Sequence, residues 1–158
     1  MPPQKGPDMT TIFDKSVRAE LIRRINTVDE TSTARWGRMN AYQMVKHCTL
    51  WEAWIQGRPP RTYKQGVMGR LFGRLALRAM TKDDRPLARN VPTSREFRSM
   101  EATGDVAAER RKWAALLEGY EQYSNPDFIH DFFGRMTREQ VGQLAYKHTD
   151  HHLRQFGA

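Results

Sequence analysis

Apolar residues recur every three or four positions in five segments of the chain, and polar connections separate these segments. This spacing is typical of amphipathic helices, in which the apolar residues share one face. It predicts four long helices, over residues 14–26, 40–56, 105–123 and 137–156. A further helix is predicted over residues 66–80. Because the chain has neither the strict alternation of strands nor an internal repeat, it is expected to be all-α.

Capping residues mark the predicted starts of two long helices. Asn40 is followed three residues later by Gln43, and Thr137 by Gln140. In each pair the first side chain can accept a hydrogen bond from the third helical amide, and the glutamine side chain can accept one from the capping residue's own amide. Residues that disfavour a helix follow the predicted ends, at Gly57, Pro59, Pro60, Asn125, Pro126 and Gly157.

The order and length of these helices predict a four-helix bundle. The connection between the second and third long helices is long, and it contains the extra helix followed by a polar surface loop over residues 81–104. The 158 residues suffice for one domain with a core, which is assigned to residues 12–158. Residues 1–11 are polar, contain prolines and are expected to form a disordered tail. Neither a signal-peptide core nor an apolar run of transmembrane length is apparent.

The net charge of +8 raises the question of an anionic partner. Arginines are scattered over the chain, and it contains no RNA-binding or zinc-finger motif, so excess surface arginine is the preferred interpretation. We therefore expect no nucleic-acid partner and no membrane partner. The single cysteine, Cys48, excludes an internal disulfide and is consistent with a reducing cytosol. It is expected to be a small buried core residue.

The helix predicted over residues 66–80 has two distinct sides. Its apolar side consists of Leu71, Phe72, Leu75 and Ala79. Arginines recur at every fourth position on another side, at Arg70, Arg74 and Arg78. Three stacked guanidinium groups could bind an anionic ligand or lipid headgroups, but a solvated face is the commoner arrangement. The role of this arginine stripe stays open.

Three of the five histidines lie close to the C-terminus, on the last predicted helix. His148 and His152 are four residues apart, which places their rings on the same face, one turn apart. The same face includes the apolar residues Val141, Leu144, Ala145 and Phe156. The pair is therefore expected to point into the protein. His151 lies at the edge of this face and is expected to face solvent or to support the other two.

A third inward histidine is predicted in the second helix. His47 lies within an arc that includes Met44, Trp51, Trp54 and Ile55. A histidine among apolar residues must satisfy two ring nitrogens, and metal binding at one with a hydrogen bond at the other does so. Three imidazoles from two helices can hold a transition metal. Three hydrogen-bonded core histidines are the alternative, and the residues alone leave both open.

Further short motifs accompany these histidines. They are Arg35–Ala41, Phe132–Gly134 before the last helix, and the tail Tyr146–Gly157. With one histidine in the second helix and a His-x-x-x-His pair in the fourth, the chain resembles the DinB-like superfamily of metal-binding four-helix bundles, within a branch known only as a domain of unknown function. The resemblance spans residues 12–157, nearly the whole chain.

This resemblance implies that His47, His148 and His152 bind a divalent metal, commonly zinc or nickel, and that His151 does not. It also implies a bacterial protein, and the composition favours the cytoplasm. Characterised members include transferases and isomerases that use low-molecular-weight thiols. The first hypothesis is therefore a metal-dependent transferase with a thiol cosubstrate and a small-molecule substrate. A homodimer is expected because related bundles often pair.

Other residues are candidates for roles beside the metal. Trp51 and Trp54 could line a pocket, although core packing is the commoner role for such residues. Arg154 or the arginine stripe could bind a cosubstrate carboxylate. His130, in the loop before the last helix, could form a pocket lip or have no role.

Two alternatives to thiol transfer differ in the groups they require. Hydrolysis by metal-activated water needs a general base, and Glu52 and Asp150 both point away from the histidine faces. A non-catalytic protein whose structural metal joins the second and fourth helices needs a closed, four-coordinate site. Cys48 would be the fourth ligand, but its side chain diverges from that of His47 by about 100° around the helix. An open coordination position would favour an enzyme.

Overall fold

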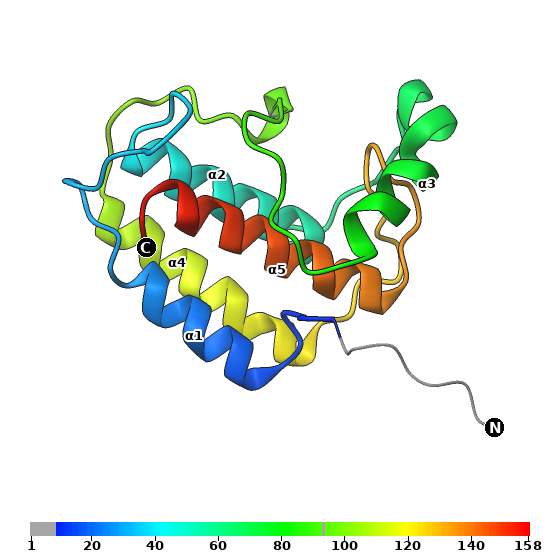
Figure 1. Ribbon diagram of the computed structural model, residues 1–158, viewed down its shortest axis with the longest axis horizontal. Coiled ribbons are helices and arrows are strands. Elements are labelled where there is room, and N and C mark those ends of the chain that lie inside the picture. The colour runs from blue at the N-terminus through cyan, green and yellow to red at the C-terminus, as the bar shows by residue number, and fades with distance from the viewer. Residues whose placement is uncertain (1–8, 93) are drawn as a thin grey trace.

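The computed structural model of the chain describes residues 9–92 and 94–158, and these residues form helices and no strands (Figure 1). The α-helices are α1 (Lys15–Ile25), α2 (Ala41–Ile55), α3 (Val67–Thr81), α4 (Val106–Glu118) and α5 (Arg138–Gln155). Two short 3₁₀-helices are η1 (Arg95–Phe97) and η2 (Gly119–Gln122). The prediction of an all-α protein is confirmed, and each of the five predicted helices is present.

Both predicted capping boxes form. Asn40 accepts a hydrogen bond from the Gln43 amide at 2.9 Å, and the Gln43 side chain accepts one from the Asn40 amide at 3.1 Å. Thr137 and Gln140 make the equivalent bonds at the start of α5, at 3.2 and 2.9 Å. These bonds satisfy amides that a helix start leaves free. They stabilise the first turns of the two helices that contain the predicted site residues.

The segment predicted as one helix over residues 105–123 is divided in the structure. α4 ends at Glu118, and the turn that follows is the 3₁₀-helix η2. At this point Gln56, just after α2, donates its side-chain amide to the carbonyl of Leu116 at 2.7 Å. A side chain at Gly119 would collide with Gln56. The regular helix thus ends, before its predicted end, at the point where Gln56 contacts it.

Four of the helices, α1, α2, α4 and α5, lie side by side around one core (Figure 1). α4 packs against α1 and α2, and α5 also packs against both. From α4 and the turn after it, Val106, Trp113, Leu117 and Tyr120 are buried in this core, whereas Leu116 is half-buried. Aromatic and aliphatic side chains from all four helices thus share one apolar interior, whose burial is the main stabilising contribution to such a fold.

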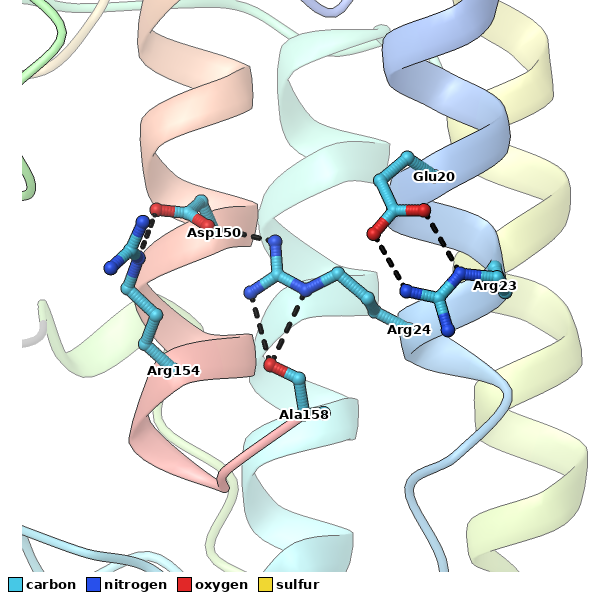
Figure 2. Close-up of polar contacts among 6 residues, drawn as sticks. All are labelled: Glu20, Arg23, Arg24, Asp150, Arg154 and Ala158. Atoms are coloured by element: carbon cyan, nitrogen blue, oxygen red, sulfur yellow. Dashed lines mark hydrogen bonds and ion pairs between the residues drawn. The ribbon is translucent and has the colours of Figure 1, made fainter.

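An ion-pair network joins α1 to α5 (Figure 2). Arg24 of α1 binds one carboxylate oxygen of Asp150 at 2.8 Å, and Arg154 binds the other at 2.6 Å. Arg24 also donates to the carbonyl of Ala158 at 3.1 and 3.3 Å. Because Asp150 is buried, its charge requires these two cations. Asp150 and Arg154, considered from the sequence as a base and a cosubstrate ligand, are therefore already paired.

A buried carboxyl group joins α2 to two other parts of the core. Glu52 has no exposed surface, and it accepts hydrogen bonds from the hydroxyl of Tyr120 and, at 3.1 Å, from that of Thr149. Burial raises the pKa of Glu52 to about 7, because the charged carboxylate is poorly solvated in the core. The group therefore titrates close to neutral pH.

α3 lies outside the four packed helices, at one end of the molecule and beside the segment that precedes α5 (Figure 1). Its backbone approaches that segment at Gly69 and Gly73, where a methyl group would overlap the backbone of Phe132. α5 holds the other end of α3, because Lys147 donates from Nζ to the carbonyl of Met80 at 2.6 Å. The position of α3 thus depends on small residues on its inner side.

The connection after α3 is not wholly a surface loop. Phe97 of η1 is buried and packs against Trp54, with ring centroids 4.9 Å apart. This aromatic anchor draws the connection over α2, close to the predicted site.

Residues 1–8 of the predicted disordered tail lie outside the described residues. Residues 9–11 of that tail are described, and among them the amide of Thr10 donates a hydrogen bond to the carboxylate of Asp84 at 3.1 Å. Within the residues that the structure does describe, no helix is long and apolar enough to cross a lipid bilayer.

The pKa of Glu52 predicts a distinct pH dependence of stability. Its folded pKa of about 7 exceeds the ordinary value of 4.5, so its contribution to the free energy of unfolding is complete below 4.5 and decreases as pH rises through 7. Between pH 5 and 8, the free energy of unfolding of the wild type should decrease by about 2 kcal/mol relative to that of Glu52→Gln. Urea unfolding at each pH measures this difference. The exposed Glu118→Gln is the control, and parallel pH curves for wild type and Glu52→Gln would contradict the buried assignment.

Candidate metal centre

The structure brings His47, His148 and His152 together. His47 lies midway along α2, and His148 and His152 lie one turn apart on α5, where α5 packs against α2. One ring nitrogen from each lies within 4.8 Å of the others. Nε2 of His47 and Nε2 of His148 are 3.0 Å apart. The three residues that helical spacing placed on inward faces therefore share one small volume.

Hydrogen bonds determine which nitrogen of two histidines is available. Nδ1 of His47 lies 2.9 Å from the carbonyl oxygen of Phe97, and a carbonyl can only accept, so this Nδ1 holds the proton. Nδ1 of His152 lies 2.8 Å from Oε1 of Gln155. The Gln155 amide donates to the carbonyl of Trp36 at 2.9 Å, which orients its oxygen toward His152. In both rings Nε2 is left with a free lone pair.

His148 is held by stacking on Trp51 and by a contact of hydrogen-bond length between its Nε2 and Nε2 of His47. Its ring lies on the indole of Trp51, with centroids 3.9 Å apart and an interplanar angle of 16°. Nδ1 of His148 is buried and has no hydrogen-bond partner among the described residues. Its Nε2 faces His47, whose own Nε2 already presents a lone pair.

These distances and tautomers suit a divalent metal. Nitrogen ligands at 2.0–2.1 Å in tetrahedral geometry are about 3.3 Å apart, which is close to the 3.0 Å between Nε2 of His47 and of His148. A hydrogen bond from the opposite ring nitrogen to a carbonyl oxygen is the usual support of a ligating histidine. The three histidines therefore lie close enough to hold one metal ion, whose identity imidazole ligands alone do not determine.

The electrostatic environment favours the neutral, ligating form of each ring. Burial lowers the pKa of His47, despite its bond to Phe97. Burial and the neighbouring histidines lower the pKa values of His148 and His152 well below the ordinary value. A neutral imidazole is the form that binds a metal, so protons compete weakly at this site near neutral pH.

A pocket of about 600 Å³ opens beside the three histidines. Its walls come from α2, α3, α5, the connection around η1 and the loop before α5. Most of the lining is apolar, and includes Trp51, Met80, Leu87, Val91, Phe97 and Phe133. A ligand in this pocket would contact hydrocarbon walls and the histidine cluster together, which is the usual composition of a small-molecule site.

The other aromatic and histidine candidates divide between pocket and core. Trp51 lines the pocket, whereas Trp54 packs in the core between Phe97 and other rings. His130 and His151 both line the pocket outside the three-histidine cluster. His151 also meets the Trp36 ring edge-on, at 5.7 Å between centroids.

Three further residues weighed from the sequence lie away from the cluster. Cys48 has no exposed surface and packs beside Met44 in the core, as expected. Glu52 and Asp150 do not line the pocket and bind other groups. Among the described residues, no cysteine or carboxylate joins the three histidines as a fourth ligand.

Sequence reasoning missed two supporting groups. Gln155 fixes the His152 tautomer, and its position three residues after His152 on the same helix is a signal that could have identified it. The Phe97 carbonyl supports His47 from fifty residues along the chain, and no local pattern indicates it.

The fold and the site together define an all-helical protein with three clustered histidines that could hold a metal. The family model of DUF1569, described as a protein of unknown function, matches residues 14–158. The chain belongs to this family. Comparison with curated proteins and with solved structures found no match.

The hydrogen bonds predict the ring tautomers of the metal-free protein. At neutral pH, His47 and His152 should both have the proton on Nδ1 and a bare Nε2, as long-range ¹H–¹⁵N correlation spectra report. Gln155→Leu removes the acceptor of His152, so it should release that tautomer and leave His47 unchanged. His151→Ala is the control. A proton on Nε2 of His47 in the wild type would show that its Phe97 bond does not form.

Proposed function

We propose that this chain is a DinB-like metalloprotein in which His47, His148 and His152 hold one divalent metal, zinc or nickel. The observation that supports this most directly is the pair of bare Nε2 atoms on His47 and His152, each directed by a carbonyl acceptor on the opposite nitrogen. The arrangement of α1, α2, α4 and α5 is consistent with a DinB-like four-helix bundle over residues 12–158.

We further propose that the site is catalytic and that the reaction is transfer to or from a low-molecular-weight thiol. A divalent metal held by three histidines would have positions open for a thiol and would lower the thiol's pKa, so that near neutral pH the thiol could lose its proton to solvent water. The protein's own groups position the reactants. Trp51 holds the His148 ring by stacking, and the apolar walls bind the hydrocarbon part of a substrate and limit access of water.

Two features favour transfer over the alternatives. A structural metal requires a fourth protein ligand, and none accompanies the three histidines in the described part of the chain. Hydrolysis requires a general base, and the two considered, Glu52 and Asp150, bind other groups away from the pocket. A thiol whose pKa the metal has lowered needs no separate base, which suits a largely apolar pocket.

Metal content tests the site itself. Untagged wild type, purified without chelator, should contain about one zinc or nickel ion per chain. His47→Ala and His152→Ala should each lose it, whereas His151→Ala should keep it, because His151 lies outside the cluster. Elemental analysis measures the content, and circular dichroism checks the fold of each variant. A metal-free wild type that also fails to take up added zinc or nickel would leave three core histidines.

Thiol binding tests the catalytic proposal separately. In protein loaded with cobalt(II), adding a low-molecular-weight thiol should produce a sulfur-to-metal charge-transfer band in the near ultraviolet, which saturates at about one thiol per metal. The pocket variant Trp51→Ala should weaken thiol binding more than metal binding, since Trp51 lines the pocket without being a ligand. A loaded site whose spectrum no thiol changes would favour the structural role.

A further inference from the structure

α3 exposes most of its large apolar side chains to solvent. Its inner side packs through Gly69, Gly73 and Leu77, which are buried. The opposite side presents five large apolar side chains, with exposed fractions of 73% for Val67, 60% for Met68, 69% for Leu71, 52% for Phe72 and 72% for Leu75. Single exposed apolar residues are ordinary, but a contiguous group of this kind marks an interaction surface.

The arginine stripe borders this apolar face. At 100° per residue, Arg70 and Arg74 fall between the buried side of α3 and the exposed apolar side, whereas Arg78 falls just inside the exposed side. All three are exposed, and none of their guanidinium groups forms a hydrogen bond or ion pair with another residue in the ranges 9–92 and 94–158. α3 contains no acidic residue, and the whole chain has a net charge of +8. The face is therefore apolar, edged by free cations, and without anions of its own.

The charges argue against a second copy as the occupant. In a symmetric antiparallel pairing of two α3 faces, the arginine edge of one helix would lie against the same edge of the other, because a twofold axis relates like to like. The guanidinium groups of the two facing edges have like charges and would repel one another. An anionic surface instead complements both features, since arginine binds phosphate and the apolar side chains enter the acyl boundary.

We propose that α3 docks this protein on the surface of anionic lipid membranes. Val67, Met68, Leu71, Phe72 and Leu75 enter the boundary between headgroups and acyl chains, and Arg70, Arg74 and Arg78 bind lipid phosphates. The helix lies in the interface and does not cross the bilayer. The proposal departs from the sequence-based expectation of no membrane partner, and it rests on the exposure of the apolar face. The surface contains no residue of the histidine cluster, so the proposal is independent of the metal.

Co-sedimentation of the purified full chain with vesicles tests the proposal. Binding to phosphatidylcholine vesicles that contain about a third phosphatidylglycerol should exceed binding to pure phosphatidylcholine by at least about tenfold, and it should weaken as salt is raised. The triple variant Arg70→Gln/Arg74→Gln/Arg78→Gln should bind anionic vesicles about 100-fold more weakly, because three cations near an anionic surface together contribute about that factor to affinity. Leu71→Ser/Leu75→Ser should lower binding to them at low and high salt alike.

Matched controls separate the face from overall charge and apolarity. Lys15→Gln/Arg38→Gln/Arg111→Gln removes the same charge from exposed positions elsewhere, and Met100→Ser removes a side chain that is 86% exposed outside α3. Both controls should bind nearly as wild type does. His47→Ala should also bind, which keeps this test distinct from that of the metal site.

Three results would overturn the proposal. The first is equal binding of wild type to neutral and anionic vesicles, or binding to neither. The second is loss of binding in the charge control that matches the loss in the α3 arginine variant. The third is a dimer in light scattering that Leu71→Ser/Leu75→Ser converts to a monomer, without α3-dependent vesicle binding, which would assign the face to a second copy of this chain.

Discussion

Buried polar side chains of α5 must each find a hydrogen-bond partner, and this requirement positions the helix that forms most of the site. The residues are Lys147, Thr149, Asp150, His152 and Gln155. Their partners come from the end of α3, from Glu52 on α2, from Arg24 on α1 and from the backbone of Trp36. A rotation of α5 or a shift by one turn would leave several of them unpaired at once, at about 1–3 kcal/mol each.

The same requirement distinguishes the histidine cluster from the rest of the core. His47 and His152 each have one ring nitrogen satisfied by a carbonyl and the other directed at a neighbouring imidazole. Between two facing ring nitrogens only one proton can lie, so lone pairs are left over when three rings converge. A cation satisfies them together. A small molecule could reach such a cation through the pocket that opens beside the histidines.

α3 links the pocket and the outer surface through the order of its small and large residues. Gly69 and Gly73 allow its inner side to lie directly on the segment before α5, where Ala76 and Met80 contribute to the pocket wall. Apart from Leu77 and Met80, the large apolar side chains of α3 lie on its outer side. An apolar pocket wall and an apolar exposed face are thus two results of one helix packing through its glycines.

The sequence by itself determined the helices, both capping boxes and the inward placement of His47, His148 and His152, because capping and helical periodicity act over only a few residues. Tertiary structure alone decided the rest. The bond from His47 to Phe97 depends on the path of a long connection, and α4 ends where Gln56, which follows α2, contacts it. Periodicity also predicts which residues of α3 share a face. Whether another segment covers that face depends on packing between parts of the chain that are distant in sequence, so a local pattern does not predict it.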